Sequence, residues 1–319
     1  MGRQSCAGLS RAGVVLRLEV PMAKILLAHP LFLSSNKAET AAASPYFPLG
    51  LLYLAAYVRE AGHDVAVFDG TFADDVSAFA EALQAETPDL VGISAVMPTR
   101  SDALLLARMA SDYGAVVILG GPDPTVSPEA YLASPSVDVV VHHEGEQTVV
   151  ALVELFAAGE LDTTALESEP GVAFRKDGQP RINEPRRPIE NLDELPLPAR
   201  DLIDMDRYLD VWEDESGYSS MTIATSRGCP YGCEWCRDAV HGNGFRQRSP
   251  ESVAEEMKTI KDTWDVTRLR MVDDVDAIDR GWLEAWAEAS EAIGAAIPFE
   301  GLNELSRQDI PLLDVRDSL

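Results

Sequence analysis

Three of the chain's four cysteines, Cys229, Cys233 and Cys236, lie close together in the stretch SRGCPYGCEWCRD. Their spacing is CxxxCxxC, and Trp235 comes directly before the last of them. Zinc and iron–sulfur clusters both take thiolate ligands. Clustered cysteines in a chain of 319 residues therefore indicate a metal site rather than the disulfide framework of a small secreted domain.

Three thiolates leave one coordination position to be filled, and the two metals fill it differently. A structural zinc needs four protein ligands that leave no open coordination position, and His241, shortly after Cys236, could complete a Cys3His set. However, no second cysteine pair follows, as it does in the usual zinc knuckles. A [4Fe–4S] cluster on three thiolates keeps one iron open to a small molecule. The sequence favours the open cluster and leaves zinc as the alternative.

The elements before the cysteines alternate in character from Lys24 onwards. Short apolar runs rich in β-branched residues, such as KILLA, DVAVFD and AVVILGG, alternate with runs of helical spacing such as LGLLYLAAYVREAG. This pattern predicts five buried parallel strands with their helices, a doubly wound, Rossmann-like α/β domain over residues 23–160. Ligands of such sheets bind beyond the carboxyl ends of the strands, which here carry glycines, prolines and short polar residues.

The remaining segments have three different patterns. We expect residues 1–22 to be a disordered extension, and residues 161–218 to be a linker with a hairpin around Asp177 and Gly178. Over 219–319 strand–helix alternation resumes, with strands at MTIATS, RLRMVDD and IPFEGL and a helix capped by Ser249. This predicts the first part of a (β/α) barrel, with the cysteine loop after its first strand, on the face where barrel active sites are built.

Composition excludes several classes of partner. The formal charge of −27, from 53 acidic and 26 basic residues, repels phosphate backbones and argues against nucleic acid. No apolar run approaches the roughly 18 residues that span a membrane. Neither GxGxxG nor GxxxxGK[ST] follows a predicted strand, which argues against dinucleotide and Walker-type nucleotide sites. Clustered free thiols favour a reducing, cytoplasmic location.

The cysteine loop resembles the signature of the radical S-adenosylmethionine (SAM) enzymes. In that family the motif holds a [4Fe–4S] cluster whose open iron binds SAM, and reductive cleavage of SAM produces a radical that abstracts hydrogen from a substrate. The resemblance implies that SAM supplies the missing ligands and that Trp235 lies near the cluster and the adenine. It also implies that Asp273 and Asp274, in RMVDD, contact SAM, and that an electron donor such as a flavodoxin or ferredoxin serves the cluster.

The upstream stretches SAVMPTR, GGPDPT and VDVVVHHEGE resemble the cobalamin-binding domain of B12-dependent radical SAM proteins. That group includes class B methyltransferases and the anaerobic magnesium-protoporphyrin monomethyl ester cyclase type. The likeness spans about residues 24 to 310 and implies that cobalamin binds to the first domain. The residues that it assigns to cobalamin contact are Ser94, Gly120, Gly121, Gly145 and Glu146.

Three features depart from the family pattern. The DxHxxG signature that supplies a histidine to cobalt is absent, because Leu27 stands two places before His29; we therefore expect cobalamin without a histidine ligand. The usual GEGE reads HEGE here, with His143 at the first glycine. After Met221 there is room for about three βα units of roughly 30 residues, where a radical SAM barrel usually has six. We therefore expect a barrel that is truncated.

Together these observations favour a radical SAM enzyme in which cobalamin assists methyl transfer to, or ring formation on, an unactivated carbon of a small-molecule substrate. A non-catalytic fragment of such an enzyme, binding cobalamin and a cluster without turnover, is the second hypothesis. A zinc-binding protein is the third.

Overall fold

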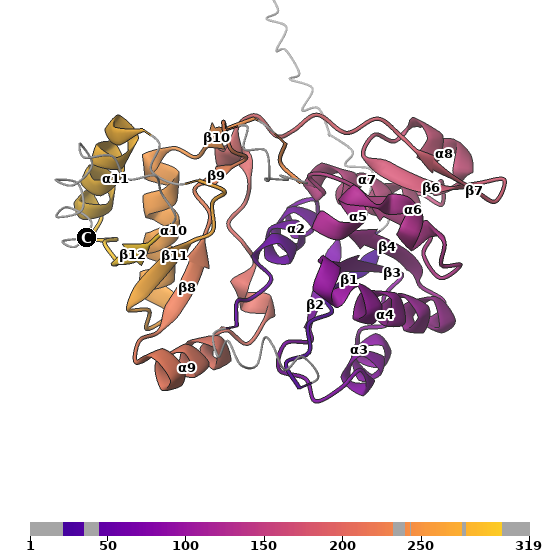
Figure 1. The fold of residues 1–319 in the computed structure, drawn as a ribbon, viewed down its shortest axis with the longest axis horizontal. Coiled ribbons are helices and arrows are strands. Elements are labelled where there is room, and N and C mark those ends of the chain that lie inside the picture. Colours follow the sequence, from indigo (N-terminus) through magenta and orange to yellow (C-terminus); the bar gives the residue numbers. More distant parts are fainter. Residues whose placement is uncertain (1–21, 35–44, 232–239, 243, 276–278, 302–319) are drawn as a thin grey trace, which may run out of the picture.

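The computed structural model describes residues 22–34, 45–231, 240–242, 244–275 and 279–301. The expected extension over 1–22 therefore lies outside the described residues, apart from Met22. Within the described part the chain forms a seven-stranded and a three-stranded sheet, which lie side by side with helix α2 between them (Figure 1), and a short two-stranded ribbon.

The larger sheet has the strand order β2-β1-β3-β4-β5-β6-β7, and its first five strands are parallel. This confirms the predicted doubly wound domain. The chain runs outward from β1 to β2 and then returns past β1 to β3, so the topological switch point lies between β1 and β3. The parallel strands are β1 (Lys24–His29), β2 (Asp64–Asp69), β3 (Leu90–Ser94), β4 (Val116–Gly120) and β5 (Val139–Val141).

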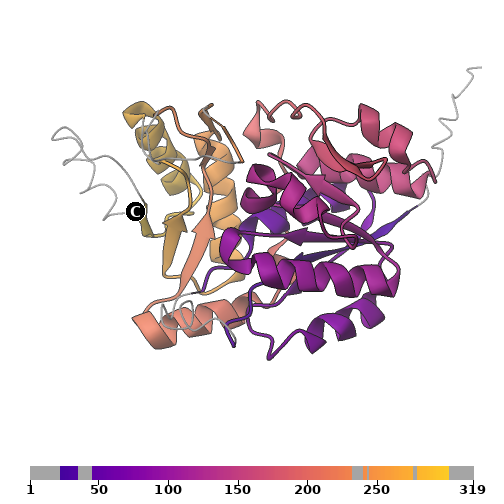
Figure 2. The ribbon, with the colours of Figure 1, turned by 45° about the vertical axis from the view of Figure 1, so that its right-hand side comes forward.

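Helices cover both faces of this sheet, because alternate strand residues are apolar on each side. One face packs against α3, α4 and α6, and the other against α2 and α7 (Figure 2). The helices are α2 (Leu49–Glu60), α3 (Ser77–Glu86), α4 (Arg100–Tyr113) after the 3₁₀ turn η1 (Met97–Thr99), α5 (Pro122–Val126), α6 (Pro128–Leu132) and α7 (Glu146–Ala157).

The predicted hairpin around Asp177 and Gly178 is present, and its two strands extend the large sheet. β6 (Val172–Lys176) pairs antiparallel with β5, and β7 (Gln179–Ile182) pairs with β6. The short helix α8 (Thr163–Ser168) precedes it. The hairpin therefore belongs structurally to the first sheet, although the sequence pattern alone places it in the linker.

The connector after the hairpin also contains regular structure that the sequence analysis did not predict. After η2 (Leu192–Glu194) and η3 (Arg200–Leu202), helix α9 (Met205–Ser216) buries Met205, Tyr208, Leu209 and Trp212. This spacing of three and four residues is that of an amphipathic helix. The Tyr208 hydroxyl donates to Asp69 at 2.6 Å, and the Trp212 indole donates to the Pro45 carbonyl at 2.9 Å, so α9 is tied to the first domain.

The second sheet is the predicted start of a (β/α) barrel. Its strands are parallel in the order β12-β11-β8, with a helix connecting each successive pair along the chain. A short antiparallel ribbon of β9 and β10 brackets the cysteine loop. The elements are β8 (Ser220–Ile223), β9 (Ser226–Arg227), β10 (Arg246–Gln247), α10 (Pro250–Thr263), β11 (Arg268–Met271), α11 (Arg280–Ala292) and β12 (Phe299–Glu300).

Helix α2 contributes to the cores of both halves. Leu51 and Ala55 pack into the core of the large sheet, whereas Leu52 packs with Met221 and Tyr208 into the core of the second half. The Leu52 carbonyl also accepts a hydrogen bond from the Ala199 amide at 3.0 Å. Among the described helices none is both long and apolar enough to cross a bilayer.

Candidate functional site

A cavity of about 330 Å³ opens at the carboxyl ends of the large sheet, where the second half approaches it. Its floor is apolar, with Leu27, Ile93 and Ile118 from three strands and Leu51 from α2. Its mouth is polar and includes residues of both halves of the protein. The cavity therefore lies at the switch-point crevice in which doubly wound sheets bind ligands.

Two adjacent glycines at the end of β4 have different structural roles. A Cβ atom on Gly120 would lie 3.5 Å from the Val141 carbonyl oxygen, an ordinary contact, so a side chain there would occupy space at the cavity wall. Gly121 has φ +102°, and a Cβ atom on it would lie 2.8 Å from the Ala95 carbonyl oxygen. Gly121 is thus required by the fold, whereas Gly120 leaves room for a ligand.

All five residues expected to contact cobalamin line this one cavity: Ser94, Gly120, Gly121, Gly145 and Glu146. They come from the ends of β3, β4 and β5, which the parallel sheet brings to one edge. His143, which replaces the family's glycine, also lines the cavity and has φ +64°, a backbone conformation that glycine adopts most easily. Its amide donates to the Thr125 hydroxyl at 3.0 Å, and its Nδ1 lies 2.9 Å from Nδ1 of His142.

The cysteine loop begins at the rim of the same cavity. Cys229 is half-buried and follows Ser226 and Arg227, both of which line the cavity. Cys233, Trp235 and Cys236 lie outside the described residues, so their contacts and the predicted cluster site stay predictions. His241, the residue considered for zinc, lines the cavity with its Nδ1 3.6 Å from a carboxylate oxygen of Glu144.

The two aspartates that follow β11 have distinct environments. Asp273 is buried, and its carboxylate accepts hydrogen bonds from the Thr225 amide at 2.8 Å, the Thr225 hydroxyl at 2.7 Å and the Ser226 amide at 2.7 Å. Burial raises the pKa of Asp273 even though these hydrogen bonds oppose the shift. Asp274 is exposed, lines the cavity and accepts from the Gly228 amide at 3.2 Å. Asp274 therefore lies at the cavity, while Asp273 braces the turn that leads to the cysteines.

Buried ion pairs join the two halves beside the cavity. Glu144 and Glu146, at the end of β5 and the start of α7, face Arg227 of β9 and Arg246 of β10. Arg227 donates to Glu144 at 3.2 Å and also to Glu146, and Arg246 donates to Glu144. No sequence pattern indicates these pairs, because Glu144 and Arg227 are 83 residues apart and neither forms part of a local pattern with the other.

These partners keep the buried groups charged. Burial alone would raise the pKa of Glu144, but the nearby His241 imidazole, the hydrogen bond from Arg246 and the charge of Arg227 hold it well below its usual range. Burial would likewise lower the pKa of Arg227, but the carboxylates of Glu146 and Glu144 raise it. The cavity mouth therefore has a fixed, paired set of charges at neutral pH.

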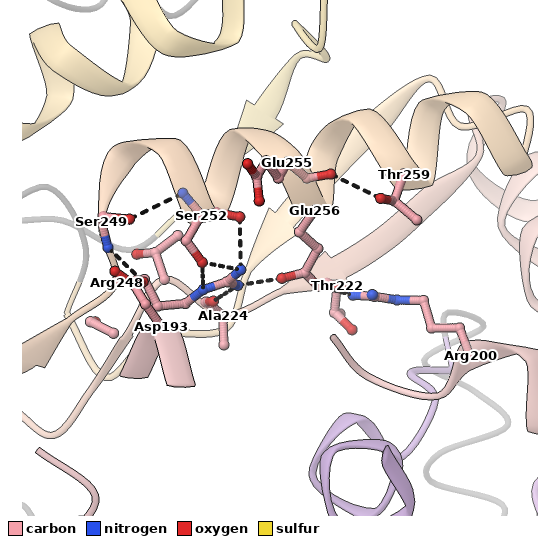
Figure 3. Close-up of polar contacts among 12 residues, drawn as sticks. Asp193, Arg200, Thr222, Ala224, Arg248, Ser249, Ser252, Glu255, Glu256 and Thr259 are labelled. Atoms are coloured by element: carbon pink, nitrogen blue, oxygen red, sulfur yellow. Dashed lines mark hydrogen bonds and ion pairs between the residues drawn. The ribbon is translucent and has the colours of Figure 1, made fainter. Parts of the chain in front are cut away.

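A second buried network lies beneath the strand that leads to the cysteine loop (Figure 3). Glu256 of α10 is fully buried and accepts from Arg200 at 2.7 Å and from Arg248. Arg200 also donates to the Thr222 carbonyl at 3.0 Å, and Arg248 donates to the Ala224 carbonyl at 3.1 Å. The network thus fixes the end of β8 to the connector and to α10.

The arrangement suits a large ligand with an apolar part. The apolar floor and the space at Gly120 would accommodate a flat or bulky apolar group, and the polar mouth would hold its polar substituents. Cobalamin, with a nucleotide tail and an amide-decorated ring, has this chemistry. The apolar floor and polar mouth of the cavity therefore fit cobalamin, the cofactor that the sequence resemblance assigns to the first domain.

Comparison with known proteins gives independent information about both halves. The family described as "B12 binding domain" matches residues 40–153. An uncharacterised methyltransferase of Pyrococcus horikoshii is 35% identical over 264 residues, which are 81% of this chain and 54% of that protein. An anaerobic magnesium-protoporphyrin IX monomethyl ester cyclase of Synechocystis is 29% identical over 255 residues, 77% of this chain and 48% of that protein.

A solved structure shares the arrangement of both halves. The radical SAM methyltransferase TsrM from Kitasatospora setae, with cobalamin and a [4Fe–4S] cluster bound, superposes with a TM-score of 0.66 and 18% identity. The match covers 85% of this chain and 52% of TsrM. At this identity the likeness concerns the fold. The chain spans about half the length of these relatives, 54% and 48% of the two curated proteins.

Proposed function

We propose that this chain, which is related to the B12-binding radical SAM methyltransferases and cyclases, binds cobalamin in its first domain and a [4Fe–4S] cluster with SAM in its second. The observation that carries the proposal is the cavity at the carboxyl edge of the large sheet. Residues of the first domain and residues adjoining the cysteine loop line it together.

Cobalamin is assigned to this cavity on three grounds. The family match, over residues 40–153, covers β3, β4, β5, α2 and most of α7, which supply most of the first-domain residues that line it. All five residues expected to contact cobalamin line it. Gly120 leaves room beside an apolar floor, as a bulky cofactor tail requires. No aspartate precedes His29 at the DxHxxG position, so the proposed binding mode has no histidine from that loop on cobalt.

The cluster and SAM are assigned to the cysteine loop and the strand ends around it. Cys229, Cys233 and Cys236 are the proposed cluster ligands, and Asp274 is the better candidate of the two aspartates for a SAM contact because it faces the cavity. When bound, the cofactors supply reductive cleavage of SAM and a methyl-carrying cobalt. The chain's own residues hold them in one cavity and fix the charges at its mouth.

Methyl transfer is the activity that we favour, and ring formation is kept because the Synechocystis relative is a cyclase. The substrate is proposed to be a small molecule. Reduction of the cluster needs an electron donor such as a flavodoxin or ferredoxin, and the thiolate ligands suit a reducing cytoplasm. The chain spans about half the length of these relatives, so it is also a proposal that this chain is active by itself.

The Gly120→Val variant tests the cobalamin site. A valine fits a β-strand and places its side chain at the cavity wall, so we expect the fold to persist while cobalamin affinity falls at least about tenfold, equivalent to 1.4 kcal/mol. Titration with hydroxocobalamin, followed by visible absorption, gives the affinity, and circular dichroism gives the melting temperature.

Gly121→Val is the contrasting variant. Its side chain would meet the Ala95 carbonyl and its backbone would be strained, so we expect a clearly lower melting temperature. Unchanged cobalamin affinity in a folded Gly120→Val protein would rule out this cavity as the cobalamin site.

Cys229→Ala tests the cluster site. After anaerobic reconstitution we expect the variant to lack a stable [4Fe–4S] cluster and its visible absorption, because one of three thiolate ligands is gone, while cobalamin affinity stays unchanged. Iron, sulfide and zinc analyses measure the outcome. Cys6→Ala, which removes the one cysteine outside the motif, is the matched control.

Electron paramagnetic resonance of the reduced protein then separates the remaining hypotheses. A [4Fe–4S] signal that shifts on addition of SAM supports the proposed enzyme. A cluster signal indifferent to SAM favours the non-catalytic fragment, and zinc in place of iron favours the zinc-binding protein. Production of 5′-deoxyadenosine and S-adenosylhomocysteine distinguishes turnover from binding.

A further inference from the structure

We propose that Glu144 is a positioning residue that fixes the cysteine loop at the mouth of the cavity, by holding both ends of that loop with one carboxylate. The functional meaning of this inference rests on the proposed function, because the loop is the proposed cluster site. The contacts that carry it are independent of any cofactor.

The β9–β10 ribbon makes this arrangement possible. Arg227 and Arg246 are directly opposite each other in the antiparallel register, and the whole CxxxCxxC motif lies in the chain between them. Arg227 donates to one carboxylate oxygen of Glu144 at 3.2 Å, and Arg246 donates to the other. A single side chain of the first domain therefore binds the beginning and the end of the loop.

Glu144 is itself held in place by the first part of the chain and the connector. It lies between β5 and α7, and its carboxylate also accepts from the Ile189 amide at 3.1 Å. Arg246 donates in turn to the Ile189 carbonyl at 2.6 Å. The side chain is 8% exposed, so the carboxylate has little freedom to take up other partners.

The loop ends also have contacts within their own half, and these do not orient the loop toward the cavity. The Gly228 amide donates to Asp274, and the Arg248 amide donates to the Thr225 carbonyl. Both join the loop to the barrel strands alone. Among the described residues, the hydrogen bonds that run from Arg227 and Arg246 to the edge of the large sheet converge on Glu144 and, through Arg227, on Glu146.

Because these contacts are ion pairs, they are better suited to orienting the two ends of the loop than to stabilising the fold. Desolvation offsets much of the attraction between the charges of a buried ion pair. The hydrogen bonds that Arg227 and Arg246 donate from their planar guanidinium groups are directional, and they therefore select one geometry of the pair. An apolar contact of the same area would permit sliding. Four largely buried charges thus specify where the two ends of the loop, Arg227 and Arg246, lie relative to the cavity.

The Glu144→Gln variant tests the inference, because it keeps the shape of the side chain and removes its charge. Hydrogen exchange measured by mass spectrometry on the full apo chain should show at least about tenfold faster exchange in peptides covering β9 and β10, with peptides of β1, β3 and β4 unchanged. Glu167→Gln is the matched control, since Glu167 also pairs with two basic residues, Lys176 and Arg181, on the distant hairpin.

A spectroscopic measurement separates positioning from simple stabilisation. In protein loaded with cob(II)alamin and a reduced cluster, pulsed paramagnetic resonance should give a narrow distribution of cobalt–cluster distances in the wild type and in Glu167→Gln. In Glu144→Gln the distribution should be broader, measured on samples prepared with the same cobalamin and iron content as the wild type. Glu144→Asp, which retains the charge, should restore part of the narrowness.

Unchanged exchange in β9 and β10 of the Glu144→Gln protein, or a distance distribution as narrow as that of the wild type, would overturn the inference. Failure of the wild type to bind cobalamin or a cluster would instead refute the proposed function. The exchange experiment needs neither cofactor and would still decide whether Glu144 holds the loop.

Discussion

Glu256→Gln should lower the free energy of unfolding of the protein by about 3–5 kcal/mol, the usual cost of removing one partner from a buried ion pair. Glu256 is fully buried and is bound by two guanidinium groups, those of Arg200 and Arg248 (Figure 3). A glutamine of the same size would leave both arginines buried without a counter-charge. Denaturant unfolding followed by circular dichroism measures the change.

Glu255→Gln is the matched control, because Glu255 is the neighbouring residue on the exposed side of the same helix. We expect a change within about 0.5 kcal/mol, as for other surface substitutions. Equal effects of the two substitutions would show that the buried network contributes nothing specific to stability.

The same network should make stability depend on pH. Burial alone would raise the pKa of Glu256, but Arg200 and Arg248 outweigh burial and hold it below 4.5. A carboxylate whose pKa is lowered by folding stabilises the protein above its unfolded pKa, and this contribution is lost as the pH falls through the folded pKa. The stability difference between wild type and Glu256→Gln should therefore be constant near neutral pH and shrink below about pH 4.5.

Asp273→Ala should destabilise the protein by about 3 kcal/mol or more. The substitution removes an acceptor from the amides of Thr225 and Ser226 and from the Thr225 hydroxyl, and each buried donor left without a partner costs about 1–3 kcal/mol. Because these donors form the turn before Cys229, we also expect lower cluster occupancy after reconstitution. Thermal unfolding and iron analysis measure the two effects.

Asp274→Asn separates this structural role from ligand binding. Asparagine keeps an acceptor oxygen for the Gly228 amide but removes the charge at the cavity, so we expect little change in melting temperature and weaker SAM binding. The reverse result, with Asp273→Ala stable and unable to bind SAM, would make Asp273 a ligand contact and not a brace.

The sequence was sufficient to predict the parts of the fold that depend on local periodicity. Five β-branched runs alternating with amphipathic runs predict the parallel sheet, and the parallel sheet brings Ser94, Gly120 and Glu146 to one edge although they are far apart in the chain. Ser249 was predicted as a helix cap, and its hydroxyl accepts from the Ser252 amide at 3.1 Å. The strand and helix patterns and the Ser249 cap depend on residues that are close in sequence, so few other local structures compete with them.

Two kinds of feature escaped prediction for different reasons. Helix α9 has an amphipathic signal, Met205, Tyr208, Leu209 and Trp212, that the neighbouring prolines of the connector obscured. The pairing of Glu144 with Arg227 and Arg246 has no local signal, because it depends on how two segments that are distant in the chain meet. The role of Asp273 was likewise hidden, since a buried brace and a ligand contact look alike in the sequence.

Helix α2 also limits how the protein can be divided. Leu51 and Leu52 are adjacent in sequence and belong to different cores, so one helix is a wall of both halves. Cutting the chain near residue 160 would leave Phe47 and Leu52 facing water on the first piece and an open face on the second. The two halves are therefore better regarded as one cooperative folding unit than as modules that can be exchanged between relatives.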